Sequence, residues 1–502
     1  MITFISLYGP ENTGIRSMSA ALKQAGIKTS LIFFKKWVNN DIRPPSEKEK
    51  EILVRLLAEL KTDIVGISLT SPFSSIAEEI ALRIKTRLNP TIIAGGIHAT
   101  VKPEECLRWS DFVLRGEGEE AMLELAKALG SGGNMKEVKN ISYIEGGKMR
   151  SNPLRPLIQD LDNLPVQDYG GGNKFYIETG LIRRDPLNRT RELRVFASRG
   201  CPYSCSYCYN SILRGMYPDQ RYFRQKKVST VIEDIEEALR HFKGIKKIKF
   251  DDDTFVFPKD WINEFSAEYS KRIGLPFEIL YNADCLDAGA LRSLMKAGLS
   301  RVQVGIQTGS EKECQTSYNR NLSVAKIREF SSLAKELGLN VVYDVILDNP
   351  LSDYGDKENL LSLLLELPRP FDIFMYSLTV FPGTKLADDL LEAGVISEND
   401  IEGNAQKSFR QFRLSLSYPR AAEELFIACL VSLTSKPFIP RKLILFLLGS
   451  RYLKRHPLLL KWPADLCNSV KLVSVAFRML REGSLGLSKL REYGLPRRFL
   501  IQ

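Results

Sequence analysis

Three cysteines, Cys201, Cys205 and Cys208, stand close together directly after an expected strand. Cysteines at spacings of four and three on one loop can reach three corners of a single iron–sulfur cluster, whose usual protein ligands are thiolates. Three ligands leave one iron of a 4Fe–4S cluster open, and an open iron can bind a substrate or a cofactor. The spacing therefore predicts a 4Fe–4S cluster with chemistry at its free corner.

The alternative for these cysteines is a structural zinc ion, which takes four closed ligands, often from two Cys-x-x-Cys or Cys/His pairs. No second pair exists, and the histidines, His98, His241 and His456, are remote from the loop in sequence. A disulfide is disfavoured as well. The first eight residues indicate a strand rather than a signal peptide, and no stretch offers the ~20 apolar residues that span a bilayer. We therefore expect a cytoplasmic protein with reduced thiols.

Alternating strand and helix signals follow the cysteine loop and must position it. Strands are expected over 193–198, 247–250, 278–281, 302–306, 341–347 and 374–378, and helices over 228–242, 261–273, 288–297, 323–337 and 358–367. Six such units predict a partial parallel (β/α)6 barrel of TIM type over residues 186–400. The site of such a barrel lies at the carboxyl ends of its strands.

A second α/β region precedes the barrel. Strands are expected over 2–8, 29–34, 64–69, 91–94 and 112–114, and helices over 17–25, 48–60, 75–88 and 119–129. Short apolar strands alternating with helices predict a Rossmann-like, doubly wound parallel sheet over residues 1–135, which binds ligands outside the carboxyl ends of its strands. A hairpin turning at 145–147 and a linker rich in Pro and Asp are expected over 136–185. Strand signals stop near residue 400, so residues 401–502 are expected to be helical.

The cysteine loop resembles that of the radical S-adenosylmethionine enzymes, whose signature is Cys-x-x-x-Cys-x-x-Cys after a strand. Its lead-in, Arg199-Gly200-Cys201-Pro202-Tyr203, is similar to the branch that carries a cobalamin-binding domain in front. The resemblance implies that S-adenosylmethionine chelates the open iron and is cleaved by electron transfer to a 5′-deoxyadenosyl radical. It implies Cys201, Cys205 and Cys208 as the cluster ligands, and Tyr207 as the aromatic residue near the adenine.

Further segments fit the same resemblance. Asp251 and Asp252 end the second barrel strand, where the family contacts the methionyl amino group. Gln307 and Gly309 belong to a Gly-Ile-Gln-Thr-Gly segment in which glutamine replaces the usual glutamate. This glutamine can hydrogen-bond a ribose hydroxyl but carries no charge. Other matching segments are Asn319-Arg320, Asp348-Asn349-Pro350 and Phe381-Pro382-Gly383-Thr384.

Strand ends in the front region resemble those of the cobalamin-binding domain. Glycines there let backbone approach a large flat ligand, and hydroxyls can hydrogen-bond the tail of the cofactor. The candidate residues are Ser68, Thr70, Gly95, Gly96, His98, Gly116 and Glu117.

The front region also departs from the better-known cobalamin domains. It lacks the Asp-x-His-x-x-Gly loop whose histidine ligates cobalt, since Tyr8-Gly9-Pro10 follows the first strand. His98 could substitute as a cobalt ligand, but we expect it to make a hydrogen bond at a strand end. The alternative for the whole region is a Rossmann-like scaffold that binds nothing, because Gly-Gly and Gly-x-Gly pairs are weak signals.

The net charge of +11 is concentrated at the end of the chain. From residue 436 onward there are fourteen basic and three acidic residues, and the remainder is close to neutral. Basic residues interleaved with apolar ones at helical intervals favour either an anionic membrane surface as partner or a helical cap packed on the barrel. No nucleic-acid recognition motif supports RNA.

Together these features predict a cobalamin-dependent radical S-adenosylmethionine methyltransferase acting on an unactivated carbon of a small molecule or lipid. Electrons would come from an external donor of flavodoxin or ferredoxin type. Alternatives are cyclisation, rearrangement or oxidation with the same cofactors, and a non-enzymatic cobalamin or redox sensor. No catalytic side chain is identified. The remaining cysteines are expected to be small buried side chains: Cys106, Cys285, Cys314, Cys429 and Cys467.

Overall fold

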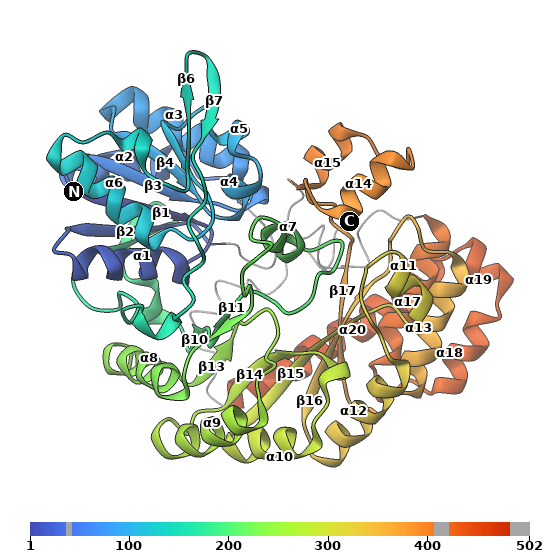
Figure 1. Cartoon of the computed structure of the whole chain (residues 1–502). Helices are drawn as coiled ribbons and strands as arrows, with labels where there is room; N and C mark the ends of the chain where they lie inside the picture. Colours follow the sequence, from blue (N-terminus) through green and yellow to red (C-terminus); the bar gives the residue numbers. More distant parts are fainter. Residues whose placement is uncertain (37–42, 406–420, 482–502) are drawn as a thin grey trace. The chain divides into compact units, whose positions relative to one another are not determined.

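The computed structural model describes residues 1–36, 43–405 and 421–481, which fall into two compact units (Figure 1). The first unit holds the described residues of 1–245 together with 380–405, and the second holds 246–379 and 421–481. Residues 380–405 therefore belong to the unit of the cysteine loop, although more than a hundred residues separate them from it in sequence.

The first unit is built on a nine-stranded sheet in the order β7-β6-β5-β4-β3-β1-β2-β8-β9. The strands are β1 (Ile2–Leu7), β2 (Thr29–Phe34), β3 (Ile64–Ser68), β4 (Thr91–Gly95), β5 (Phe112–Leu114), β6 (Ile141–Glu145), β7 (Lys148–Ser151), β8 (Lys174–Glu178) and β9 (Leu181–Arg184). β1 to β5 and β8 run parallel, and antiparallel pairing begins at β6 and at β9. The carboxyl ends of β3, β4 and β5 therefore share one edge.

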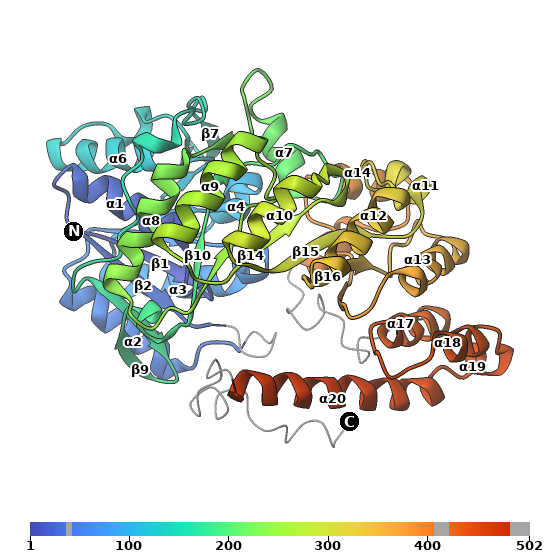
Figure 2. The same ribbon diagram turned by 90° about the horizontal axis from the view of Figure 1, so that it is seen from below.

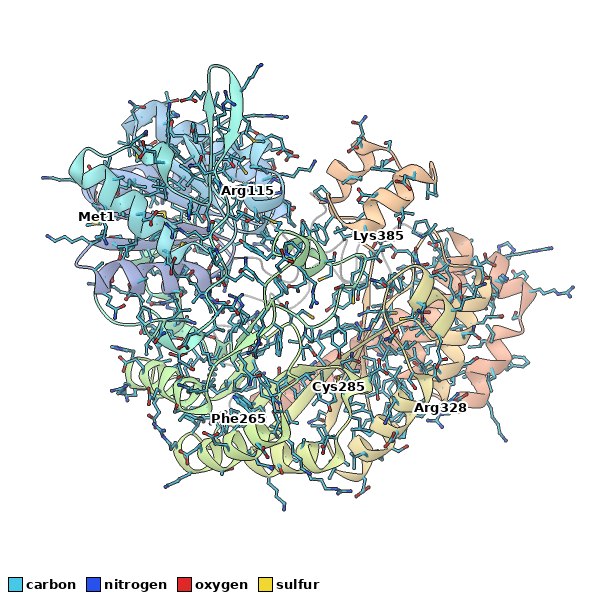
Figure 3. The ribbon with its side chains drawn as sticks, in the orientation of Figure 1. Met1, Arg115, Phe265, Cys285, Arg328 and Lys385 are labelled. Atoms are coloured by element: carbon cyan, nitrogen blue, oxygen red, sulfur yellow. The ribbon has the colours of Figure 1, made fainter. Side chains whose placement is uncertain are left out.

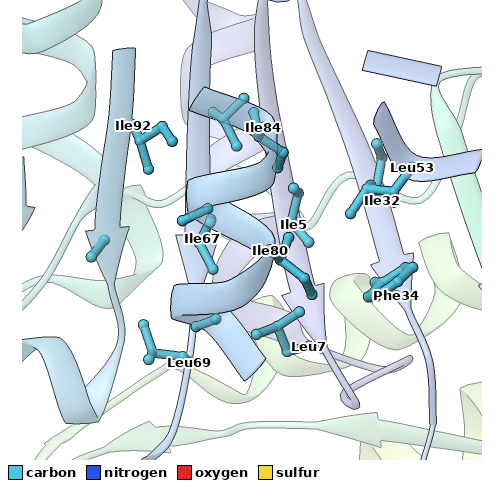
Figure 4. Packing of buried hydrophobic residues seen from close by; sticks show 14 of the residues in the cluster. Ile5, Leu7, Ile32, Phe34, Leu53, Ile67, Leu69, Ile80, Ile84 and Ile92 are labelled. Carbon is cyan, nitrogen blue, oxygen red and sulfur yellow. The ribbon is translucent and has the colours of Figure 1, made fainter. Parts of the chain in front are cut away.

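Apolar side chains cover both faces of this sheet. Ile5, Ile67 and Leu53 are almost fully buried on the face covered by α2 (Glu47–Glu59) and α3 (Ser74–Leu88), as Figure 4 shows. The opposite face packs against α1 (Thr13–Gln24) and α6 (Glu119–Ser131), through residues such as Ile15 and Met122. Strands buried on both faces appear as continuous apolar runs in the sequence, which explains why β1 to β4 were predictable.

Buried charges fix the segment that follows the hairpin. Arg16 of α1 donates to both carboxylate oxygens of Asp185, at 2.8 and 2.7 Å. Asp168 accepts hydrogen bonds from Lys174 and Ser19, both at 2.6 Å. Each of these carboxylates is buried, so its partners are required to offset the cost of removing the charge from water.

Shorter elements complete the first unit. They are β10 (Glu192–Val195), β11 (Ser198–Arg199), α7 (Tyr209–Gly215), β12 (Arg224–Gln225), α8 (Val228–His241), α14 (Lys385–Glu392) and α15 (Glu398–Ala405). β11 pairs antiparallel with β12, so the chain enters and leaves the cysteine loop side by side.

Five parallel strands, in sequence order, form the sheet within the second unit. They are β13 (Lys247–Phe250), β14 (Phe277–Tyr281), β15 (Leu299–Gln307), β16 (Asn340–Ile346) and β17 (Asp372–Tyr376). The connecting helices are α9 (Lys259–Arg272), α10 (Ala288–Ala297), α11 (Glu311–Thr316), α12 (Val324–Glu336) and α13 (Tyr354–Glu366). Phe265 of α9 lies at the centre of an aromatic cluster with Phe250 and Phe277 (Figure 3).

Helices alone make up the C-terminal part of the second unit. α17 (Ala422–Thr434) is buried from Phe426 to Thr434 and contacts α13, α18 (Arg441–Leu448), α19 (Arg451–Arg455) and α20 (Leu458–Arg481). Figure 2 shows α20 as one long helix, which packs beside α17. Among the helices of the described residues, none combines the length and the apolar character needed to cross a membrane.

The predicted fold class is confirmed: a Rossmann-like α/β region, a parallel barrel-type sheet and a helical C-terminal region. β8 and β9 were not predicted and fall in the stretch expected to be a hairpin and linker. They were missed because Lys174 and Glu178 bring charges to buried strand positions, where ion pairs with Asp168 and Lys35 satisfy them.

Replacing Asp185 with Asn preserves side-chain size but leaves the buried Arg16 guanidinium without its charged partner. Breaking a buried ion pair from one side costs about 3–5 kcal/mol. We expect D185N to lower the free energy of unfolding of the first unit by that order in urea titrations. The matched control is D63N, because exposed Asp63 pairs with the N-terminus and exposed pairs contribute about 0–1 kcal/mol. Equal losses in the two variants would contradict this role of Asp185.

Candidate active site

A pocket opens in the first unit at the carboxyl ends of β3, β4 and β5. Its volume is about 320 Å³, and its walls are largely apolar, with Phe4, Ile67 and Met122 among the lining residues. Of the seven front-region candidates, five line this pocket: Ser68, Gly95, Gly96, Gly116 and Glu117. Thr70 and His98 do not line it.

Two of the lining glycines are required by the backbone. Gly96 has a φ of +97°, and a Cβ there would lie 2.6 Å from the carbonyl oxygen of Leu69. Gly116 has a φ of +72°, and a Cβ would collide with the Tyr217 hydroxyl. Gly95, by contrast, has open space where a Cβ would stand. This bare strand end allows a ligand to contact the backbone directly, which fits a bulky cofactor tail.

His98 has a polar neighbour at each ring nitrogen, but within the described part of the chain only its Nδ1 forms a hydrogen bond. Its Nδ1 lies 3.0 Å from the Ser71 hydroxyl and its Nε2 3.2 Å from a Glu105 carboxylate oxygen. The Ser71 hydroxyl also lies 2.6 Å from the hydroxyl of Tyr209, the residue after Cys208. The contact with His98 holds the pKa of Glu105 below its usual range. These contacts favour a hydrogen-bonding role for His98 over cobalt ligation.

Glu117 and Glu119 connect the pocket to the cysteine loop. Glu117 accepts from Arg199 at 3.1 Å, from Arg224 at 2.9 Å and from the backbone N–H of Ile158 at 2.8 Å. Glu119 accepts from Arg199 at 2.6 Å and from Ser17 at 2.8 Å. Burial alone would raise the pKa of Glu119, but the Arg199 guanidinium keeps it below its usual range. Arg199 is thus held by two carboxylates of the pocket wall.

The cysteine loop begins at Gly200, whose φ of +81° and tight approach to Tyr222 exclude a side chain. The Cys208 N–H donates to the Cys205 carbonyl at 3.0 Å, and α7 begins directly afterwards. Arg214 of α7 donates back to the Cys201 carbonyl. Cys205 is buried, and Cys201 and Cys208 are partly exposed.

The donor set of this loop fits a three-thiolate cluster site. None of the three cysteines forms a disulfide, and the loop backbone is held at both ends by β11, β12 and α7. Among the described residues, no three His, Cys, Asp or Glu side chains form a preassembled metal site.

A segment from far along the chain packs on this loop. The Leu386 N–H donates to the Ser206 carbonyl at 3.0 Å, and the Phe381 ring lies 4.6 Å from that of Tyr209. Gly383 has a φ of +77°, and a Cβ there would touch Ile212 of α7. The 381–384 segment, matched in sequence to the end of the barrel, is thus part of the support for the cysteines.

In the second unit, three of the candidates end strands. Asp251 follows β13 and pairs with Lys249 at 3.0 Å, and its neighbour Asp252 is buried. Gln307 ends β15 with a φ of +61°, just after a bulge in the pairing with β16. Such strained positions cluster at functional sites, where the backbone re-aims a side chain.

Hydrogen bonds hold the Gln307 segment in place. Arg320 donates to the Gly305 carbonyl at 2.6 Å, which gives the Asn319-Arg320 motif a structural role. A Cβ on Gly309 would lie 2.5 Å from the backbone of Asn359, so this turn packs directly on α13. Tyr207 lies in the first unit, in the turn between Cys205 and Cys208, and is partly buried.

The 348–350 segment joins the ends of neighbouring strands. Asp348 accepts from the Leu378 N–H at 2.7 Å, beyond β17. Asn349 donates to buried Glu313 of α11 at 3.0 Å. Burial raises the pKa of Glu313.

The remaining cysteines are single. Cys106, Cys314 and Cys429 are buried, and burial raises the pKa of the Cys106 thiol to about 12. Cys285 and Cys467 are partly buried.

Sequence reasoning missed the network of Glu119, Arg199 and Arg224. Glu119 is the last residue of the Arg-Gly-Glu-Gly-Glu segment, and Arg199 is the first residue of the cysteine motif. Both are therefore close in sequence to the candidate site residues Glu117 and Cys201. Because Glu119 and Arg199 are eighty residues apart, local sequence patterns do not predict that they pair.

Two family models match the chain. The radical SAM superfamily matches residues 195–364, and the B12 binding domain matches residues 7–126. The cysteine loop lies within the first range and the pocket-lining candidates within the second.

Relatives of known name match in sequence. An uncharacterized methyltransferase of Pyrococcus horikoshii is 27% identical over 66% of this chain and 70% of its own length. An anaerobic magnesium-protoporphyrin IX monomethyl ester cyclase of Rubrivivax gelatinosus is 30% identical over 64% of this chain, but over only 56% of its own length.

Among solved structures, the fold is similar to that of OxsB, a cobalamin-dependent S-adenosylmethionine radical enzyme solved with aqua-cobalamin and S-adenosylmethionine bound. The TM-score is 0.67 at 16% identity, covering 98% of this chain and 82% of OxsB.

Replacing Glu117 with Gln removes the charge shared by Arg199 and Arg224. Hydrogen bonds to charged groups contribute about 1.5–3 kcal/mol each, so we expect a looser cysteine loop. E117Q should then retain clearly less iron per chain after anaerobic reconstitution and gel filtration than the unmodified protein.

The matched control is E120Q, the same substitution on exposed Glu120 of α6. If E117Q retained as much iron as E120Q, the ion pairs of Glu117 with Arg199 and Arg224 would not be supporting the cysteine loop.

Proposed function

We propose that this chain, which belongs to the cobalamin-binding radical S-adenosylmethionine proteins, is a methyltransferase acting on an unactivated carbon of a small molecule or lipid. Its cofactors are a 4Fe–4S cluster, S-adenosylmethionine and cobalamin. The observation that carries the proposal is that one unit holds both a three-cysteine loop and a pocket with a bare strand end at Gly95, linked by Arg199.

Residue roles form part of the proposal. Cys201, Cys205 and Cys208 would hold the cluster, with Tyr207 beside the adenine. Gly95 and the other pocket-lining candidates would hold the cobalamin tail, supported by the open space above Gly95. Asp251, Asp252, Gln307 and Gly309 would contact S-adenosylmethionine, supported by the strand-end position of the aspartates and the strained backbone of Gln307.

Bound together, these groups supply a carbon-centred radical from S-adenosylmethionine and a methyl group carried by cobalamin. The protein's own side chains position them. Arg199 and Glu119 keep the loop against the pocket wall, and the 381–384 segment packs on α7 through Phe381 and Gly383. The apolar pocket wall excludes water from the part of the ligand it encloses.

The chain also requires a reductant from outside, which we propose to be a flavodoxin or ferredoxin. We propose the division of labour by sequence as 1–135 for cobalamin, 136–185 as connection, 186–400 for radical chemistry and 401–502 as a basic helical region. The family matches at 7–126 and 195–364 support the two larger parts. A cytoplasmic location with peripheral membrane contact is proposed from cysteines that form no disulfide in the described residues and from the basic C-terminal region.

A second reading keeps the cofactors but transfers no methyl group, and the similarity to a cyclase favours it as the alternative. A sensor without turnover is a weaker alternative, because the cysteine loop is intact.

The function is tested with the full chain, reconstituted without oxygen with iron, sulfide and hydroxocobalamin. It is given S-adenosylmethionine bearing a trideuterated methyl group, a strong reductant and a small-molecule extract. We expect 5′-deoxyadenosine, S-adenosylhomocysteine and a product carrying the labelled methyl group. C205S should lose the deoxyadenosine and the labelled product, because removing one of three thiolates destroys the open-iron site. The control C467S, at a single partly buried thiol, should retain them.

The outcomes separate the readings by product. Deoxyadenosine with an unlabelled product of altered mass would replace methyl transfer by the cyclase-type reading. If the protein contained iron but formed neither 5′-deoxyadenosine nor S-adenosylhomocysteine, the result would contradict radical chemistry altogether.

A further inference from the structure

Exposed apolar side chains gather in the C-terminal helices. Ten of the nineteen large apolar residues that are exposed in the described chain lie between residues 438 and 470. They are Phe438, Leu443, Leu445, Phe446, Tyr452, Leu458, Leu459, Trp462, Leu466 and Val470. A concentration of exposed apolar side chains usually marks an interaction site, whereas single exposed apolar residues need no explanation.

The residues on α20 form one stripe. Leu459, Trp462, Leu466 and Val470 follow spacings of three, four and four, which align side chains along one helix face. Leu460 and Ala464 are buried, and α20 packs on α17. A helical cap explains this buried face but leaves the outer stripe unexplained.

α18 repeats the pattern. Ile444 is fully buried, whereas Leu443 and Phe446, one turn apart, are exposed. Trp462 and Phe446 have 80% and 76% of their surface in contact with solvent. Large aromatic side chains are costly in this position unless another apolar phase covers them.

The same stretch is strongly cationic. Between residues 438 and 470 there are six basic residues, and the one acid, Asp465, pairs with Lys461 at 2.7 Å. Lys442, Arg451 and Arg455 are exposed, and none forms an ion pair with another residue in the described ranges. A second copy of this surface would be repelled by like charge, whereas an anionic surface would be attracted.

We infer that α18, α19 and α20 form a docking surface for an anionic lipid bilayer. Phe446, Trp462 and Leu466 enter the boundary between headgroups and acyl chains. Lys442, Arg451 and Arg455 contact lipid phosphates. This is the arrangement of an interfacial amphipathic helix, which lies in the membrane plane and does not cross it. The inference goes beyond the proposed methyl transfer and is independent of it, since vesicle binding requires no turnover.

The test is flotation of the full chain with vesicles of phosphatidylcholine alone or with phosphatidylglycerol added. We expect binding to the anionic vesicles, weaker at high salt, and little to the neutral ones. W462S/L466S should lower the partition coefficient by tenfold or more, because two apolar side chains no longer leave water. K442Q/R451Q/R455Q should lower it by about fivefold for each cation removed.

The matched control is L82S/L181S, which replaces two exposed leucines of the first unit and should bind like the unmodified protein. All variants should keep the thermal unfolding midpoint of the unmodified chain, because the replaced side chains are exposed. Absence of binding to anionic vesicles, or binding insensitive to W462S/L466S, would overturn the inference. Self-association without vesicles that W462S/L466S abolishes would assign the stripe to contacts between copies instead.

Discussion

The first unit depends on the ion pairs that the carboxylates of Glu117 and Glu119 form with Arg199 and Arg224. The two carboxylates enter a poorly solvated position only because Arg199 and Arg224 neutralise them there. An uncompensated buried charge would cost several kcal/mol, about as much as a typical domain's margin of stability. The pocket wall and the start of the cysteine loop therefore cannot move independently. A cofactor in the pocket and a cluster on the loop would share one rigid support.

The second unit positions its candidates differently, through hydrogen bonds between charged side chains and backbone groups at strand ends. Arg320 holds the Gly305 carbonyl, and Asp348 joins the ends of β16 and β17. Both contacts use backbone groups that a parallel sheet leaves unpaired at its carboxyl edge, where ligands of such sheets bind. The strained backbone of Gln307 persists because these neighbours fix it.

Much of this organisation could be predicted from sequence, since it follows from local patterns. Apolar runs located β2, β5 and β13 to the residue, and the cysteine spacing identified the cluster loop. Features that depend on distant partners could not be predicted. β8 was not predicted because it carries the charged residues Lys174 and Glu178, whose neutralising partners lie outside the strand. The role of Arg199 becomes visible only when its ion pair with Glu119 is known. The support from Phe381 becomes visible only when the fold places its ring against that of Tyr209.

The proposed radical chemistry requires that three thiolates leave one iron of the 4Fe–4S cluster without a protein ligand. Electron paramagnetic resonance of the reduced, reconstituted full chain, with and without S-adenosylmethionine, tests this directly. The account predicts that the signal of the 4Fe–4S cluster shifts when S-adenosylmethionine is added, because its amino and carboxylate groups occupy the open iron. A cluster signal that is the same with and without saturating S-adenosylmethionine would mean that the fourth iron is already ligated, and would contradict the account.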